Sequence, residues 1–463
     1  MAFKSHLPGF EAVENFRNKL HEDYGTDVPL TAILVVFLLE LFIFHAFAPA
    51  QSTANWAMAA FLSPLWLPPM LARAAFLRWH DYLRWRVASR TKAILLEIRI
   101  PREVNKTPLA METVFAGMHI GIGETTWHKK FVAGGIRPWW SFEIASIEGQ
   151  VRFFVWTPEY MRSAVENYLY AQYPAIELVE AEDYTRTINP LTDKYAMDAF
   201  EFKHEKADPY PIRTYIDFGL DKPGASEPDE LVDPLAQVLE LMGSFKPGQQ
   251  LWMQIVIRVA KAEKYNGKKN KDGKPYTWKD QAKEEVETIR AKATSKTTYK
   301  DPATGKTVEV AGHPNPTKGE AETIAAIERN TSKLGFETGI RVVYMQQKDT
   351  PYTAAGAFAS NMLKPFNSEQ LNSFKPAEVY NGAIKGYPWE DPRGKKKEAE
   401  MEDAVYRYRR RAFFYPPYIC GHTMVLSTEE LATLFHIPSS TVSTPSLPRL
   451  QSSTSEAPSN LPT

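Results

Sequence analysis

Two segments of this sequence come nearest to a nucleotide-binding site. A phosphate loop follows the pattern Gly-x-x-x-x-Gly-Lys-Ser/Thr, because its backbone amides must wrap around the phosphates. Here five residues separate Gly267 from Gly273, and a proline follows Lys274. Residues 305–307 have the Gly-Lys-Thr ending, but Lys300 occupies the position of the first glycine. We therefore predict that this chain does not hydrolyse ATP and has no catalytic residues.

Metal, thiol and cofactor chemistry have equally little support. The ten histidines include no His-Glu-x-x-His pair, and a single cysteine cannot supply a zinc-binding pair. Cys420 lies in no recognised motif of a catalytic nucleophile. Since it is the single cysteine of the sequence, no internal disulfide can form, which fits a reducing compartment. We predict no metal and no cofactor.

Clusters of basic residues could instead bind the phosphates of DNA or of lipid headgroups. Residues 261–300 contain 12 basic and 6 acidic residues, and residues 395–397 and 407–411 form two further clusters. The candidate contacts are Lys268, Lys269, Lys271, Lys274, Arg407, Arg409, Arg410 and Arg411. Any such attraction is local, because the whole chain balances 55 basic against 55 acidic residues. The competing interpretation is an ordinary solvated surface.

Two apolar runs, residues 30–48 and 56–77, predict a transmembrane hairpin. The first has 19 residues, which span roughly 28 Å as a helix, close to the thickness of a bilayer core. The second run contains three prolines and Arg73, so a re-entrant or interfacial segment is its alternative. Glu40 lies inside the first run. In a structural role it would be protonated or paired with a polar group of the second run; in a functional role it would serve partner recognition or proton handling.

Charge around the hairpin predicts its orientation. Basic residues follow the second run closely, whereas residues 50–55 carry no charge, so the soluble part should face the cytoplasm from the inner membrane. Interfacial tryptophans should help to fix the depth. The membrane-contact candidates are Glu40, His45, Trp56, Arg73, Arg78, Arg84 and Arg86. We expect residues 1–27 to form an amphipathic segment and residues 28–90 to form the hairpin with its basic flank.

Residues 91–190 predict a ferredoxin-like domain. Strands are expected at 93–100, 140–147, 151–156 and 176–179, and helices should start at the Thr-Pro pairs 107–108 and 157–158. The order β-α-β-β-α-β packs two helices on one face of an antiparallel sheet. An RNA-binding protein would need exposed aromatic residues on that sheet, but we expect Phe153, Phe154 and Trp156 to lie in a core or interface.

Residues 191–350 predict a second α/β domain, a distant copy of the first. We expect strands at 199–203, 212–218, 251–259 and 339–345, a helix at 228–242, and another helix that includes Ile324, Ile327 and Leu334. Residues 261–316 form a basic insertion between these elements. Residues 351–437 should form a helical and strand extension. The fold class is therefore α+β: a membrane hairpin, two ferredoxin-like α/β sandwich domains and a tail.

Several segments resemble a bacterial family of uncharacterised membrane proteins. They are residues 100–115, 142–158, 170–185, 371–376, 406–418 and 426–438. The family is similar to the N-terminal, non-ATPase portion of conjugation-type secretion ATPases, in which an element like residues 428–438 leads through a proline-rich connector into the motor. The resemblance implies that the motor of this system is a separate chain, a hexameric ATPase.

The C-terminal segment is the predicted docking element for that ATPase. Thr428 should cap a short helix whose Leu431, Leu434 and Phe435 form an apolar docking patch. Residues 438–463 contain Ser, Thr or Pro at 17 of 26 positions and should be disordered until bound. The alternative is that the helix packs on its own domain and the tail has no role.

Together these features predict a membrane-anchored scaffold subunit of a type IV secretion or conjugation-like machine. Its expected partners are the ATPase, membrane lipid, DNA and further copies of itself. A membrane-tethered nucleic-acid-binding protein is the first alternative, and a membrane enzyme with an unfamiliar site is a more distant one. DNA binding that weakens steeply with salt would favour the first alternative, and substrate turnover would favour the second.

Overall fold

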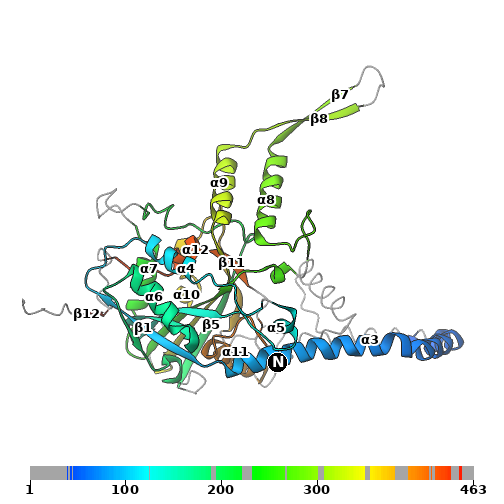
Figure 1. Cartoon of the computed structure of the whole chain (residues 1–463), viewed down its shortest axis with the longest axis horizontal. Helices are drawn as coiled ribbons and strands as arrows, with labels where there is room; N and C mark the ends of the chain where they lie inside the picture. Colours follow the sequence, from blue (N-terminus) through cyan, green and yellow to red (C-terminus); the bar gives the residue numbers. More distant parts are fainter. Residues whose placement is uncertain are drawn as a thin grey trace, which may run out of the picture.

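The computed structural model describes residues 39, 42–43, 45–124, 126–188, 194–221, 232–265, 268–300, 307–349, 355–380, 395–416, 419, 423–439 and 448–450. The predicted α+β class is confirmed: helices surround a large, mostly antiparallel sheet (Figure 1). Along this sheet the strands lie in the order β10-β5-β9-β6-β2-β3-β1-β12, with β4 also on β1 and β11 also on β9. One continuous sheet runs through both of the segments that were predicted as α/β domains.

The strands of the main sheet come from the whole length of the chain after α3. Those of the first half are β1 Ala93–Pro101, β2 Trp139–Ile147, β3 Gln150–Pro158 and β4 Glu177–Glu180. Those of the second half are β5 Tyr195–His204, β6 Gln249–Val259, β9 Gly335–Gln347 and β10 Phe374–Tyr380. The C-terminal strands are β11 Met424–Ser427 and β12 Arg449–Leu450.

The two halves repeat one pattern of pairing. The first half has the order β4-β1-β3-β2, and the second has β10-β5-β9-β6, with antiparallel neighbours throughout. They join where β2 pairs antiparallel with β6, from Trp139 opposite Arg258 to Ile147 opposite Gln250. The seam therefore lies at the centre of the sheet.

The strands predicted at 140–147 and 151–156 are confirmed as β2 and β3, which form an antiparallel hairpin. Ile147 pairs with Gln150, so Glu148 and Gly149 alone make the turn. Their φ angles are 53° and 86°, the left-handed values that a tight hairpin requires at both central residues. A side chain at Gly149 would also collide with the carbonyl of Phe245.

Helices cover the two faces of the sheet unequally. The main core lies under α4 Leu109–Gly117, α6 Arg162–Gln172, α7 Pro234–Gly243, α10 Ala355–Ser360 and α12 Thr428–Leu434. The opposite face is covered by α11 Lys395–Arg409 and by the segment 411–415 that follows it. Along β2, Phe142 and Ile144 enter the main core while Glu143 and Ala145 face α11, as the alternation of a strand requires.

The predicted basic insertion forms an arm that projects from the body (Figure 1). Two antiparallel helices, α8 Trp278–Lys292 and α9 Lys318–Ser332, carry the hairpin of β7 Thr294–Lys300 and β8 Thr307–Pro314 at their far end. A small core of Ala282, Val286, Ile324 and Ile327 holds the helices together. Each helix begins with a capping box, at Thr277 and Thr317 respectively.

Several predicted elements need correction. Residues 212–218 form turns instead of a strand, because Asp217 accepts hydrogen bonds from the backbone amide and hydroxyl of Thr214. Strand β3 extends through Pro158, so the next helix starts after it with a 3-10 turn, Glu159–Met161. The first helix begins at Leu109 without a capping side chain. Leu334 lies beyond the end of α9 and is exposed.

The described residues also include three further short 3-10 helices. They are Tyr184–Arg186, Ala262–Tyr265 and Lys364–Phe366. The predicted C-terminal extension, residues 351–437, is not a separate appendage, because β10 pairs with β5, β11 pairs with β9, and α10 and α12 contribute to the main core.

The N-terminal part is dominated by α3 Pro49–Arg90, a long helix that leaves the body (Figure 1). Most of the first predicted membrane run lies outside the described residues. Among all the residues that the structure describes, no single helix meets the length and apolarity required to cross a bilayer. The segments Pro49–Leu65 and Leu67–Arg90 of α3, bent by 57° against each other, meet that requirement only as a pair.

Candidate functional site

Large apolar side chains are exposed along the whole of α3. They are Trp56, Met58, Phe61, Leu62, Leu65, Leu71, Phe76, Trp79, Tyr82 and Trp85. Phe61 is 83% exposed and Leu65 is 75% exposed. A soluble monomer rarely exposes a contiguous apolar surface of this kind, which typically marks contact with a membrane or a protein partner.

The predicted membrane-contact residues occupy different environments. Trp56, Arg73, Arg78 and Arg86 are exposed on α3, whereas Arg84 is partly buried. His45 Nδ1 lies 3.2 Å from Ser52 Oγ. Glu40 lies outside the described residues, as do Cys420, Gly267 and Gly305.

A chain of ion pairs joins α3 to the centre of the sheet. Arg84 of α3 contacts Glu124 at 3.2 Å, and Glu124 contacts Arg137 at 3.1 Å. Arg137 is fully buried and contacts Glu337 of β9 at 3.3 Å, and Glu337 contacts Arg258 of β6 at 2.5 Å. Because one buried charge satisfies the next, removal of any member would leave an uncompensated charge in the interior. The orientation of α3 is thus coupled to the central strands.

Tyr415, from the C-terminal part of the sequence, contacts this series of ion pairs at Arg137. Its hydroxyl accepts a hydrogen bond from the backbone amide of Arg137 at 2.8 Å and donates one to the carbonyl of the same residue at 3.0 Å. The guanidinium of Arg258 lies 4.5 Å from the ring centre of Phe414 and 5.1 Å from that of Tyr415. Burial raises the pKa of Tyr415, which keeps its hydroxyl a donor.

A row of polar side chains crosses four neighbouring strands on the same face. Glu143, Gln254, Arg341 and Glu201 stand opposite one another in successive strands β2, β6, β9 and β5. All four are at most 3% exposed. Gln254 donates to Glu143 at 3.0 Å, and Arg341 donates to Glu201 at 2.8 Å. The row extends across the seam and therefore links the two halves.

The segment that follows α11 covers one end of this row. Its Arg411 donates to both carboxylate oxygens of Glu143, at 2.9 and 3.0 Å, and to Asp183 at 2.6 Å. Burial alone would raise the pKa of Asp183, but Arg411 outweighs it and lowers that pKa. Arg411 has a φ of 48°, a strained value for this residue type that its buried contacts must maintain.

This arrangement corrects the prediction for the C-terminal arginines. Arg411 is fully buried and cannot contact DNA or lipid in this structure. Arg407 pairs with Asp403 at 2.5 Å, and Arg409 donates to the carbonyls of Thr185 and Ile188. Arg410 alone of the four is exposed. The sequence pattern did not reveal that one residue of this arginine run, Arg411, binds the buried row of polar side chains. We call Arg411 with its partners Glu143 and Asp183 the clamp.

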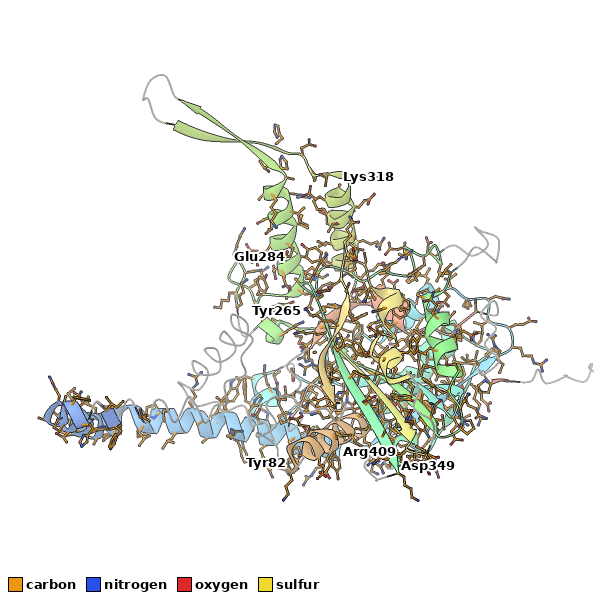
Figure 2. All side chains as sticks on the ribbon, turned by 180° about the vertical axis from the view of Figure 1, so that it is seen from behind. Tyr82, Tyr265, Glu284, Lys318, Asp349 and Arg409 are labelled. Carbon is orange, nitrogen blue, oxygen red and sulfur yellow. The ribbon has the colours of Figure 1, made fainter. Side chains whose placement is uncertain are left out.

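The four predicted lysines of the insertion lie together in a loop beside α8. Lys268 pairs with Glu284 at 3.3 Å, and Lys271 pairs with Glu287 at 3.4 Å. Lys269 and Lys274 are exposed. Figure 2 shows Glu284 and Lys318 along the arm, away from the sheet. Part of the predicted positive charge is therefore neutralised within the arm.

Helix α12 contradicts the predicted docking patch. Leu431, Leu434 and Phe435 are at most 1% exposed, and the ring of Phe435 contacts those of Phe142 and Phe153 at 5.0 and 5.6 Å. They are core residues, which agrees with the alternative that the helix packs on its own domain. The burial of Phe153, and of Phe154 beside it, also excludes base stacking on these rings.

The start of α12 contains a buried carboxyl group. The capping residue is Ser427 and not Thr428, and Glu430 completes the capping box. Glu430 also accepts a hydrogen bond from the amide of Ile212 at 3.0 Å. Burial raises the pKa of Glu430 to about 8, although both backbone donors act in the opposite direction. Burial likewise raises the pKa of Glu429.

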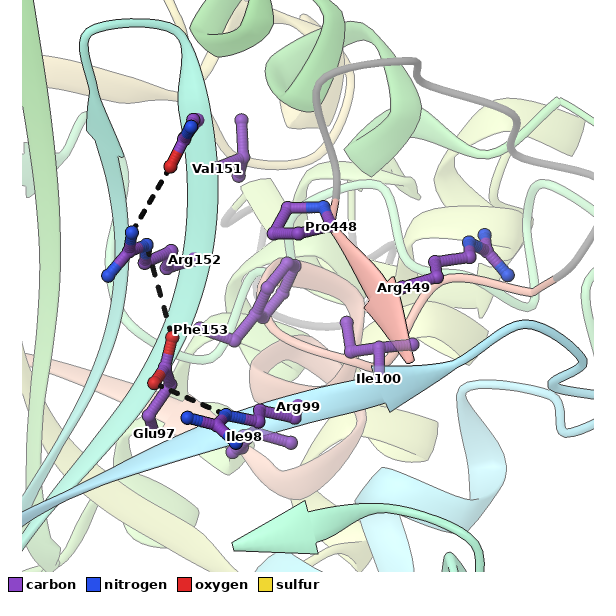
Figure 3. Close-up of a pocket in the computed structure, with 10 residues that line it drawn as sticks. Glu97, Ile98, Arg99, Ile100, Val151, Arg152, Phe153, Pro448 and Arg449 are labelled. Atoms are coloured by element: carbon purple, nitrogen blue, oxygen red, sulfur yellow. Dashed lines mark hydrogen bonds and ion pairs between the residues drawn. The ribbon is translucent and has the colours of Figure 1, made fainter. Parts of the chain in front are cut away.

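Part of the predicted disordered tail is ordered. Arg449 and Leu450 form β12, which pairs parallel with Ile100 and Pro101. Figure 3 shows Pro448 facing Phe153 of β3, whereas the Arg449 side chain points away from β3; these residues line a hollow of about 320 Å³. Glu97 lies on its rim, 3.6 Å from Arg99 and 3.9 Å from Arg152. Residues 440–447 and 451–463 lie outside the described part.

The main features that sequence analysis missed are the buried charges. Glu143, Gln254, Glu337 and Arg341 interrupt otherwise apolar strands, and that interruption was a usable signal, since buried polar groups require partners. Within the described ranges no group of three or more His, Cys, Asp or Glu residues is placed to hold a metal ion.

The fold and these features define an α+β protein with a long apolar N-terminal helix, a clamped central sheet and a projecting arm. The chain belongs to the family described as domain of unknown function (DUF8128), whose model matches residues 83–449. This range begins within α3 and ends at β12. No curated protein matches the chain.

Proposed function

We propose that this protein is a membrane-anchored, non-enzymatic scaffold subunit of a type IV secretion or conjugation-like machine. Its body faces the cytoplasm from the inner membrane, and a separate hexameric ATPase docks on it. The single observation that carries the proposal is the exposed apolar surface of α3, which is joined to the central sheet by the ion pairs from Arg84 to Arg258. A rigid connection between an anchor and a body is what a scaffold needs to hold a partner at a fixed place.

Membrane attachment is tested with the full-length chain. It should stay in the membrane fraction after alkaline carbonate extraction, and a reporter fused after Thr463 should be active only in the cytoplasm. The warrant for the orientation is the basic flank after residue 77 and the uncharged stretch 50–55. Extraction into the soluble fraction, or a reporter active only outside the cytoplasm, would contradict the proposal.

The ATPase is proposed to dock on the tail, now that α12 is excluded as a surface patch. Deletion of residues 438–463 should weaken recovery of a hexameric ATPase in a pull-down from solubilised membranes. Deletion of residues 451–463 alone is the matched control for β12, because it retains Arg449 and Leu450. Equal recovery with both deletions and with the full chain would remove the tail from the interface. Purified protein should show no ATP hydrolysis of its own.

We also propose that the two halves are ferredoxin-like units fused edge to edge. The support is the repeated strand order, in which the fourth strand lies beside the first and the third lies between the first and second. In the second half the arm is inserted between the second and third strands, β6 and β9. Excision of the arm should therefore leave the second unit folded.

A second candidate function is nucleic-acid binding by the arm, which the exposed Lys269 and Lys274 favour. If both contact phosphates, the Lys269→Ala/Lys274→Ala variant should reduce the slope of log affinity against log salt by about 2. Lys318→Ala, farther along the arm, is the control. A slope unaffected by the double variant would exclude this contact. A membrane enzyme remains the most distant alternative, which substrate turnover would support.

A further inference from the structure

A hollow of about 480 Å³ lies where α3 meets the body, between its last turns and the loop after α5 Trp127–Phe131. Arg86 and Arg90 line it from α3, and Val132 and Ala133 line it from the loop. Leu83 and Val87 of α3 also line it. The hollow thus has both cationic and apolar lining residues.

The wall formed by the loop is held in place by close packing. Gly134 has a φ of 66°, and a Cβ added there would come within 2.8 Å of the backbone oxygen of Leu83. Phe131 at the end of α5 packs against Phe76 and His80 of α3, with ring centres 5.6 and 4.9 Å apart. The loop therefore cannot approach or leave α3 without disrupting these contacts, and the hollow is part of the fold.

The two arginines are four positions apart and so lie on one side of the helix. Both are exposed. Planar guanidinium groups are well suited to bind phosphate oxygens through paired hydrogen bonds. They also lie near the negative end of the helix, where a cation is favourable in itself, so a purely structural role is the alternative to be tested.

The surroundings indicate where a phosphate would come from. Trp79, Tyr82 and Trp85 form an exposed aromatic series on α3, with successive ring centres 5.7 and 5.8 Å apart. Trp127 on α5 is 67% exposed, and Val132 at the hollow is 48% exposed. Exposed aromatic rings beside arginines are typical of the headgroup layer of a membrane.

We infer that this hollow binds the phosphate of an anionic phospholipid headgroup. Arg86 and Arg90 hold the phosphate oxygens, while Leu83, Val87 and Val132 contact the glycerol and the upper acyl carbons. The inference rests on the proposed membrane attachment and adds to it a specific lipid class and a specific place. The lipid would fix the rotation of α3 against the body at the membrane surface.

The test uses full-length protein in detergent with equal amounts of phosphatidylglycerol and phosphatidylcholine, followed by delipidation and mass spectrometry of the retained lipid. Wild-type protein should retain phosphatidylglycerol in excess. The Arg86→Gln/Arg90→Gln variant should lose this excess about tenfold or more, the change expected when charge-assisted hydrogen bonds to phosphate are lost. The matched control is Arg73→Gln, on the same helix but outside the hollow, which should retain wild-type selectivity.

A second variant changes the side of the hollow that the loop after α5 forms. Val132→Asp keeps both arginines but places a negative charge in the hollow, and it should also abolish the excess of phosphatidylglycerol. An unchanged urea unfolding midpoint for both variants would exclude misfolding as the cause. Selectivity that survives in both variants would overturn the inference and leave the arginines as stabilisers of the helix end.

Inorganic phosphate separates the two sources of this ligand. Added at millimolar concentration, it should not displace retained phosphatidylglycerol, because it lacks the apolar part that contacts Val132. Displacement by phosphate alone would assign the hollow to free anions and overturn the lipid inference. Carbonate extraction of the double variant is the independent check: a variant that stays in the membrane but loses lipid selectivity separates failure of this site from failure of the anchor.

Discussion

The body and the arm of this molecule differ in the burial of two ion pairs: the pair in the body is buried, and the pair in the arm is exposed to solvent. In the body, Glu143 and Arg411 are at most 1% exposed and contact each other through two hydrogen bonds. In the arm, Arg290 and Glu328 form an ion pair at 3.1 Å between side chains that are 52% and 59% exposed. The residue types are similar, but the surrounding solvent differs.

This difference determines what each ion pair can contribute. An exposed pair is screened by water and contributes little, typically below about 1 kcal/mol. A buried pair gains little net free energy as a pair, but loss of one partner leaves the other charge without compensation in the interior. The body is therefore intolerant of single changes at its polar row, whereas the arm should accept them.

The largest expected effect is at the clamp. Arg411→Ala should reduce the free energy of unfolding by about 3–5 kcal/mol, because it leaves Glu143 buried without its partner. Arg290→Ala in the arm removes the same charge and should cost less than about 1 kcal/mol. Urea denaturation of both variants in the same detergent measures the contrast. Equal losses would mean that burial does not decide the role of these pairs.

A pH dependence should follow from Glu430, and it should amount to a few kcal/mol at most. The pKa of Glu430 is raised from its ordinary 4.5 to about 8, so the folded chain retains a proton that the unfolded chain releases. Stability from this group is complete below about pH 4.5 and declines as the pH rises to about 8. Denaturation between pH 5 and 8 checks this decline, and Glu430→Gln should flatten it. A wild-type curve that rises over this range would contradict the assignment.

The close contact between Gly339 and Phe413 predicts a smaller loss. A Cβ at position 339 would overlap the Phe413 ring, so Gly339→Ala should cost about 1–3 kcal/mol through overpacking. In a double-mutant cycle, Phe413→Ala should relieve part of that cost, since the two groups occupy the same space. Additive losses would show that the ring does not restrict position 339.

The smallest effect is expected at the end of the arm. Replacement of residues 294–314 by a short turn removes β7 and β8 but retains the α8–α9 core of Val286 and Ile327. The free energy of unfolding of the body should change by less than about 0.5 kcal/mol. Hydrogen exchange of β6 and β9 amides measures this directly. Faster exchange in those strands would show that the arm supports the sheet.

The sequence was informative about local structure and much less so about distant pairing. Strands β2, β3, β6 and β9 could be recognised because they are rich in apolar, β-branched and aromatic residues and have turn signals between them. The 212–218 segment failed for a local reason, since the Asp217 side chain competes with the ladder for the amide of Thr214.

The sequence did not predict the clamp or the core position of α12 for a different reason. Arg411 and Glu143 are 268 positions apart, and an arginine run has the same composition whether it faces water or a buried carboxylate. The apolar side of α12 was recognised, but a single amphipathic helix does not disclose which surface covers it. Both features depend on contacts between segments that are far apart in the sequence, and no local pattern encodes such contacts.

The return of Phe435 to the rings of Phe142 and Phe153 has a consequence for how the protein is made. Phe435 follows Phe142 by 293 positions, so at about 5–20 residues per second it leaves the ribosome roughly 15–60 s later. During that interval the first half has an incomplete core. We therefore expect the body to complete its folding only when nearly the whole chain has been synthesised.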